Sequence, residues 1–187
     1  MALIYEDCLK EAIGLHGDAC MGILLGTRMT VSALPRIGIH DPKGEDRKKL
    51  MVFVEIDRCA TDAIMAITGC RPGKRTMKVL DYGKMAATFV NLETGRAVRV
   101  LPDPALKKLG SGAEGGLPDL GAIPEEELLI IQEVEVELRP EDLPGRPLRT
   151  CRCEQCGDKI MDGREVERGG RVLCRPCDGQ NHYYSAI

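Results

Sequence analysis

The chain contains 187 residues with a mass of 20.5 kDa, a length that fits one domain with a small addition or two compact domains. Hydrophobic residues make up 43% and charged residues 29%, which excludes a chain that is disordered throughout. The net charge of -3 provides no general attraction for nucleic acid or for an anionic membrane, so binding of either needs a local basic patch.

Nine cysteines occur in a chain that shows no export signal. Residues 1–7 lack the basic start and apolar stretch of a signal peptide, and no apolar run approaches the roughly 20 residues that span a bilayer. We therefore expect a cytoplasmic protein without membrane association, whose reduced thiols bind metal or react.

The apolar pattern predicts a mixture of helices and strands. Helical periodicity covers three segments, residues 4–14, 18–34 and 57–68. Apolar runs of strand length occupy residues 50–56, 77–81, 86–92 and 97–101, and a turn at residues 93–95 joins the last two as a hairpin. Helices before and between strands, followed by a hairpin, predict an α+β domain with a mixed β-sheet flanked by helices.

Two segments rich in proline mark the boundaries of the parts. Residues 101–124 form a loop interrupted by a helical turn at residues 105–109, and apolar periodicity returns over residues 125–138, with a period of two in its second half. The second segment, residues 140–147, precedes five of the nine cysteines. The expected parts are a core domain over residues 1–140, a linker over 141–149 and a four-cysteine zinc-finger domain over 150–187.

Two Cys-x-x-Cys pairs carry the strongest chemical signal, with seventeen residues between them: Cys153 and Cys156, then Cys174 and Cys177. Each pair forms a tight knuckle, and four thiolates complete the tetrahedral shell of Zn²⁺ with no open position. The pattern predicts one structural zinc per chain, whose binding energy folds this short segment, with a hairpin between the pairs. Iron fits the same shell. Cys151 is a competitor for the first position, but Cys153 is preferred because only it completes a Cys-x-x-Cys pair.

The charges of this zinc finger favour a protein partner over nucleic acid. Its arginines and lysines are nearly balanced by acidic residues, and few aromatic side chains are available to stack on bases.

A second group of candidate functional residues lies in the N-terminal part of the chain. His16 and Cys20 bracket the start of a predicted helix, where backbone N–H groups favour a thiolate, and Cys59 begins another predicted helix after a buried strand. These three residues are the candidates for catalysis. The alternative is structural, with small buried thiols and a satisfied loop histidine. Three cations are candidates for binding an anionic cofactor, or are simply solvated: Arg28, Lys74 and Lys84.

Several motifs occur in one order over about residues 10–101. They are His-Gly-Asp-Ala-Cys-Met-Gly at residues 16–22, Leu-Gly-Thr-Arg-Met at 25–29, Cys-Ala-Thr-Asp-Ala-Ile at 59–64, Thr-Gly-Cys-Arg-Pro-Gly-Lys at 68–74, Asp-Tyr-Gly-Lys at 81–84 and Val-Arg-Val at 98–100. In these motifs the chain resembles the FmdE family, named for a subunit of formylmethanofuran dehydrogenase, some members of which carry a C-terminal treble-clef zinc finger.

The resemblance implies a thioredoxin-like core, a homodimer and a metal- or thiol-based site at the His16–Cys20 motif and Cys59. It further implies an accessory role, related to methanogenesis, beside the subunits of a molybdenum or tungsten formylmethanofuran dehydrogenase. Where the family has a second histidine, this chain has Asp18. A carboxylate binds zinc but suits soft metals less well, so we expect a weak second site at His16, Asp18, Cys20 and Cys59, empty or partly occupied in the isolated protein.

Three functions are compatible with these residues. The first is a metal-binding accessory protein. The second is a thiol- or metal-dependent enzyme with Cys59 or Cys20 as the nucleophile and His16 as the base. The third, which the acidic composition disfavours, is a zinc-finger regulator that binds nucleic acid. The sequence leaves open whether the protein is an enzyme.

Overall fold

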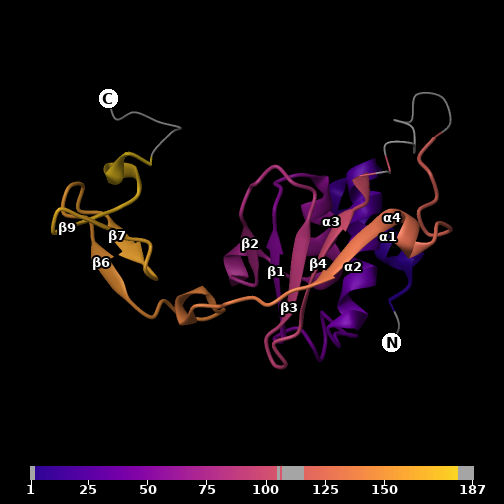
Figure 1. The fold of residues 1–187 in the computed structure, drawn as a ribbon, viewed down its shortest axis with the longest axis horizontal. Helices are drawn as coiled ribbons and strands as arrows, with labels where there is room; N and C mark the ends of the chain where they lie inside the picture. Colours follow the sequence, from indigo (N-terminus) through magenta and orange to yellow (C-terminus); the bar gives the residue numbers. More distant parts are fainter. Residues whose placement is uncertain (1–2, 105, 107–115, 181–187) are drawn as a thin grey trace. The chain divides into compact units, whose positions relative to one another are not determined.

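A computed structural model describes residues 3–104, 106 and 116–180 (Figure 1). The helical turn expected at residues 105–109 therefore lies almost entirely outside the described residues. The chain divides into two compact units, Met1–Glu137 and Leu138–Ile187, which are called the core and the finger below. All nine cysteines lie in the described part and are free thiols. None of the described helices combines the length and apolar character that crossing a bilayer requires.

The helices and strands of the core agree with the apolar pattern. The helices are α1 (Tyr5–His16), α2 (Met21–Arg36), α3 (Cys59–Thr68) and α4 (Glu125–Leu128), with a single 3₁₀ turn η1 (Pro72–Lys74). The strands are β1 (Leu50–Val54), β2 (Met77–Val79), β3 (Ala87–Asn91), β4 (Ala97–Pro102) and β5 (Leu129–Glu133). The α+β class predicted from the sequence is confirmed.

The five strands form one mixed sheet in the order β2-β1-β3-β4-β5. Strands β1 and β2 run parallel and are connected through α3, whereas the other neighbours are antiparallel. The expected hairpin joins β3 to β4. Its turn is held by Asn91, whose side-chain oxygen accepts a hydrogen bond from the N–H of Glu93, and by Gly95, which takes the left-handed conformation (φ 74°).

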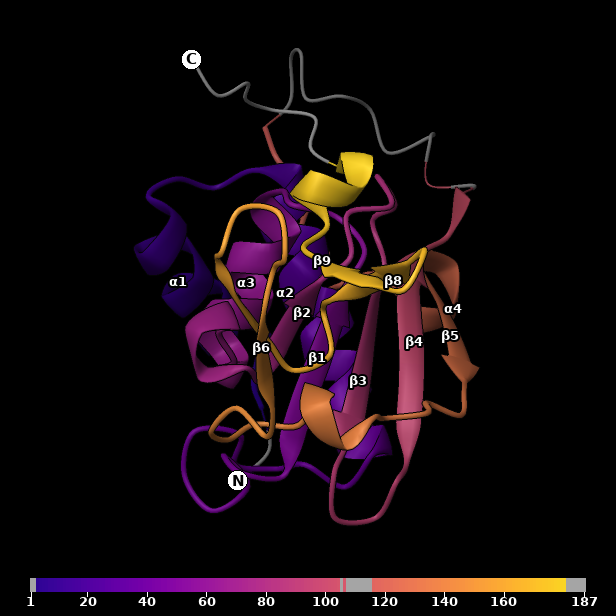
Figure 2. The same cartoon turned by 90° about the vertical axis from the view of Figure 1, so that its left-hand side faces the viewer.

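Helices α1, α2 and α3 gather on one face of this sheet (Figures 1 and 2). Because side chains alternate along a strand, every second residue faces the helices, and Val52, Phe89 and Val98 are almost fully buried there in one apolar cluster. The core of the unit lies between the sheet and the helices.

Helices α2 and α3 approach unusually closely because α2 carries glycine at positions 22 and 26, one turn apart. A Cβ added at Gly26 would lie 2.7 Å from both Cα and the carbonyl oxygen of Ala60 on α3, and one added at Gly22 would lie 2.8 Å from Cβ of Cys59. No side chain fits in that space. The glycines thus bring the N-terminal ends of the two helices together, and these ends carry Cys20 and Cys59.

The finger consists of two antiparallel hairpins and short helical turns. The strands are β6 (Thr150–Arg152), β7 (Lys159–Met161), β8 (Val166–Arg168) and β9 (Arg171–Leu173), and the turns are η3 (Pro140–Asp142) and η4 (Pro176–Gln180). Its apolar cluster is small and centres on Cys153, Ile160 and Leu173. Residues 141–149 are bonded within this unit, since Asp142 pairs with Arg164 and the N–H of Leu148 donates to Asp162.

Candidate metal centres

The four cysteines of the finger converge on one point. One sulfur from each of Cys153, Cys156, Cys174 and Cys177 lies within 4.8 Å of the other three. Between Cys156 and Cys174 the sulfurs are 3.8 Å apart. Four Zn–S bonds of about 2.3 Å at tetrahedral angles separate the sulfurs by roughly 3.8 Å. The arrangement therefore suits a tetrahedral Zn²⁺ ion.

Backbone geometry explains how each pair forms its knuckle. After the first pair, the N–H of Gly157 donates to the carbonyl oxygen of Cys153 (2.9 Å) with the glycine in the left-handed conformation, φ 80°. After the second, the N–H of Asp178 donates to Cys174 in the same way (3.0 Å). Cys151 lies on β6 opposite Ile160 and is not one of the four clustered sulfurs. The structure thus favours Cys153 over Cys151.

Without a bound metal, the thiols of Cys153 and Cys177 differ in pKa. Hydrogen bonds from backbone N–H groups, led by that of Cys156, lower the pKa of Cys153 to about 6. A hydrogen bond with Cys174, followed by burial, raises the pKa of Cys177 to about 12. Four adjacent thiolates repel one another, and a divalent cation removes that penalty. The donor set therefore fits Zn²⁺.

A second group of ligand atoms lies in the core, where three helix ends meet. His16 is the last residue of α1, Cys20 precedes the first turn of α2, and Cys59 is the first residue of α3. One atom from each lies within 4.8 Å of the other two, and Nε2 of His16 is 4.0 Å from Sγ of Cys20. We call these three residues the core trio. The sequence motifs predict a site at these three residues, and the fold brings their side chains together.

The local chain path accounts for this convergence. Gly17 ends α1 in the left-handed conformation (φ 108°), and its N–H donates to the carbonyl oxygen of Ile13 (2.8 Å). The chain then turns immediately into α2. Both sulfurs lie at helix N-termini, where unpaired N–H groups and the helix dipole stabilise a thiolate or a thiolate-bound cation.

Two carboxylates lie beside the imidazole of His16, and they differ in position. Oδ2 of Asp62 is 2.8 Å from Nδ1 of His16, whereas Oδ1 of Asp18 is 3.6 Å from Nε2. The side chain of Asp18 is 76% exposed. Asp18 is not part of the cluster with the sulfurs. Asp62 is not among the site residues predicted from the sequence. Its signal is the three-residue spacing from Cys59, which places both on one face of a helix.

The electrostatics of the core trio bear on thiol chemistry. A hydrogen bond with Cys20, followed by burial, raises the pKa of Cys59. Without a bound metal, Cys59 is therefore a protonated thiol at neutral pH. It would need a nearby cation or base in order to act as a nucleophile.

The three candidate anion-binding cations have separate places. The guanidinium of Arg28 donates to the carbonyl oxygen of Ile123 (3.2 Å) and so ties α2 to the loop before α4. Lys74 ends the 3₁₀ turn η1 and Lys84 lies in the loop between β2 and β3, and both are exposed. No geometry in the described residues gathers these three around a common ligand.

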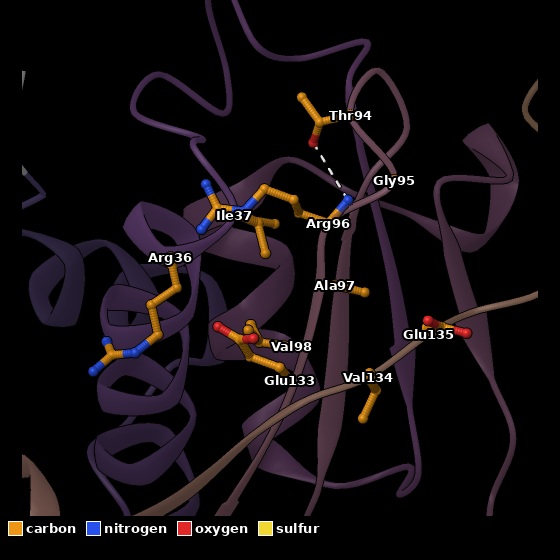
Figure 3. A pocket seen from close by; sticks show the side chains of 10 residues that line it. All are labelled: Arg36, Ile37, Thr94, Gly95, Arg96, Ala97, Val98, Glu133, Val134 and Glu135. Atoms are coloured by element: carbon orange, nitrogen blue, oxygen red, sulfur yellow. Dashed lines mark hydrogen bonds between the residues drawn. The ribbon is translucent and has the colours of Figure 1, made fainter.

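A cavity of about 420 Å³ opens elsewhere on the core, between the end of α2, the β3–β4 turn and the residues after β5 (Figure 3). Its lining carries both signs of charge, from Arg36, Arg96, Glu133 and Glu135 (Figure 3). Arg36 is already paired with Glu125. The residues that line this cavity include none of the predicted site residues.

The structure thus defines a protein of two units, an α+β core with three clustered candidate metal ligands and a finger with four clustered cysteines. Residues 15–131 match the family described as "FmdE, Molybdenum formylmethanofuran dehydrogenase operon", and residues 146–179 match the "Prokaryotic dksA/traR C4-type zinc finger". The chain belongs to the FmdE family, which confirms the resemblance seen in its motifs.

Two relatives extend along nearly the whole chain. A "Probable S-adenosyl-L-methionine-binding protein" of Archaeoglobus fulgidus is 30% identical in an alignment of 206 positions, gaps included. The alignment covers 96% of this chain and 54% of that protein. The chain thus spans about half the length of this curated relative. A crystal structure of an FmdE-like protein from Syntrophus aciditrophicus, named for a tungsten formylmethanofuran dehydrogenase, is 25% identical, with a TM-score of 0.57, and the match covers 96% of this chain and 95% of that one.

Proposed function

We propose that this protein is a metal-binding accessory protein with a structural zinc in the finger and a second metal at the core trio. One observation carries the proposal: two separate groups of sulfur and imidazole ligands, each within 4.8 Å, lie in units that match an FmdE domain and a C4-type zinc finger. These ligand types suit zinc.

The two centres differ in the number of protein ligands. The finger supplies four and leaves no position for another ligand, so its metal stabilises the fold. The core trio supplies three, two thiolates and one imidazole, which leaves one position for water, a small ligand or the exposed carboxylate of Asp18. A partly exposed three-ligand site binds metal less tightly, so we expect it to be partly occupied in the isolated protein.

Elemental analysis of anaerobically purified protein tests both sites. We expect between one and two zinc ions per chain, rising to two after zinc loading. Cys153→Ser should remove the finger zinc, His16→Ala should remove the core metal, and the control Cys151→Ser should retain both. A zinc-loaded protein that holds one ion, unaffected by His16→Ala, contradicts the proposed core site.

The partner of this accessory role is proposed to be a molybdenum or tungsten formylmethanofuran dehydrogenase, with the protein acting as a homodimer in the cytoplasm. Support comes from the family to which the chain belongs and from the crystallised relative named for that enzyme. Capture of tagged protein from native anaerobic extract should retain dehydrogenase subunits, and light scattering should give the mass of two chains. Absence of dehydrogenase from the captured material contradicts the proposed partner, and the mass of one chain contradicts the homodimer.

Two fold assignments belong to the same proposal. A parallel β1–α3–β2 unit beside an antiparallel β3–β4 hairpin supports a thioredoxin-like core. Two hairpins followed by a helical turn, with a knuckle after β6 and another at η4, support a treble-clef finger.

The open position of the core trio also favours a second candidate, a metal-dependent enzyme. In that case the metal binds and polarises a substrate beside His16. Alkylation separates this candidate from unassisted thiol catalysis, because a metal-bound thiolate is protected from iodoacetamide and a free catalytic thiolate is labelled quickly at pH 6.

A further inference from the structure

We infer that Asp62 is a positioning residue that orients His16 and fixes which imidazole nitrogen faces the metal. The inference rests on the proposed metal site at the core trio, and it adds a residue that the ligand set does not contain.

The geometry around the imidazole is directional. Oδ2 of Asp62 lies 2.8 Å from Nδ1, while Nε2 lies 4.0 Å from Sγ of Cys20. A tetrahedral zinc with Zn–N of about 2.0 Å and Zn–S of about 2.3 Å separates nitrogen from sulfur by roughly 3.5 Å. Nε2 is therefore the ligand atom, and Nδ1 is the nitrogen that the carboxylate engages.

The fold makes this pairing a fixed feature. Asp62 and Cys59 are three residues apart on α3, so one face of one helix provides both a sulfur ligand and the orienting carboxylate. His16 is the last residue of α1, a helix that packs on α3, and its side chain is only 19% exposed. The imidazole is thus held between Asp62 on one side and the sulfurs on the other.

The chemistry follows from the two nitrogens of histidine. A neutral imidazole carries one proton, and a carboxylate that accepts from Nδ1–H leaves the lone pair on Nε2 free for a cation. Metal-bound histidines commonly donate their other N–H to such a group, whose loss weakens metal binding by about 10–100-fold. The competing interpretation is an ordinary partly exposed ion pair, which has no effect on the tautomer or on metal affinity.

The test compares Asp62→Asn with the matched variant Asp18→Asn in the full-length protein, since both remove a carboxylate near the same ring. In protein labelled with ¹⁵N-histidine, the ring signals report the tautomer directly. The chain has only three histidines, and His16→Gln assigns the signals of His16. At a pH where the rings are neutral, we expect the Nδ1–H tautomer in the wild type and in Asp18→Asn, and loss of that preference in Asp62→Asn.

Competition with a zinc chelator provides the second measurement. We expect Asp62→Asn to weaken the core site by about 10–100-fold, with the finger site and the far-UV circular dichroism unchanged, and Asp18→Asn to have a smaller effect. If the wild type binds only the finger zinc, the proposed core site fails, and the tautomer measurement still decides whether Asp62 orients His16. An Nε2–H tautomer in the wild type overturns the inference even if Asp62→Asn does not fold. Equal behaviour of the two variants in both measurements also overturns it.

Discussion

The close contact between α2 and α3 predicts that Gly26→Ala destabilises the core. In the native structure the new methyl carbon would lie 2.7 Å from Cα and from the carbonyl oxygen of Ala60, and 2.9 Å from Cβ of Ala63. Two of these atoms belong to the backbone of α3 and cannot rotate away, so the helices must separate.

The size of the effect follows from two opposing contributions. Overpacking in a well-packed interior costs about 1–3 kcal/mol, and the contacts at Gly26 place it in the upper part of that range. Replacing glycine by alanine inside a helix gains about 1 kcal/mol. We therefore expect Gly26→Ala to lower the free energy of unfolding by about 1–2 kcal/mol.

Gly14→Ala is the matched control. Gly14 also lies inside a helix, α1, but a Cβ there has nothing within 4 Å. The same chemical change should raise the free energy of unfolding by about 0.5–1 kcal/mol. Urea unfolding followed by circular dichroism at 222 nm, which reports mainly on the core helices, measures both variants. If Gly26→Ala proves as stable as Gly14→Ala, the packing argument is refuted.

Two further predictions concern the finger. Hydrogen bonds from Arg139 and Arg164 lower the pKa of Asp142 from its usual 3.8 to about 2. The pairing therefore stabilises the finger above about pH 4, and this stabilisation is lost as the pH falls toward 2. Carboxyl ¹³C NMR should show the low titration midpoint of Asp142, and an ordinary midpoint would contradict the pairing. Gly157→Ala forces alanine to adopt φ 80° and should cost about 1 kcal/mol, a loss of roughly fivefold in zinc affinity by chelator competition. Gly157→Asn should restore most of that affinity because asparagine tolerates this conformation, and equal affinities for alanine and asparagine would argue against a strained knuckle.

Local patterns in the sequence predict much of the fold because they reflect local physics. The helices follow from apolar periodicity, and the four clustered cysteines follow from spacings that a knuckle requires. Strand β5 shows where this reasoning is limited. The period-two alternation over residues 134–138 is typical of a strand. However, β4 begins at Ala97, whose carbonyl oxygen accepts a hydrogen bond from the N–H of Val134. Residues after Val134 therefore extend beyond the end of β4 and have no described strand beside them to pair with. The strand therefore lies over Leu129–Glu133, the more apolar segment.

The surroundings of the core trio could not be read from the sequence because they depend on how helices pack. His16 and Asp62 are 46 residues apart, and only the contact of α1 with α3 brings them within hydrogen-bonding distance. Arg28 is a comparable case, since its guanidinium is engaged by the carbonyl oxygen of Ile123, 95 residues away. A sequence motif identifies residue types that suit a metal, whereas orientation and availability are tertiary properties.

The same glycines that pack the core also bring Cys20 and Cys59 of the core trio close together. A Cβ at Gly22 would be 2.8 Å from Cβ of Cys59 and 3.7 Å from Sγ of Cys20, so this glycine lies against both cysteines. A side chain there would push Cys20 and Cys59 apart and would weaken the proposed core metal site, even where the fold tolerates it. In the finger the ligands are held by knuckles of a few residues, so its site depends on local turns. In the core the three candidate ligands come from the ends of three helices, so the proposed metal site depends on how α1, α2 and α3 pack.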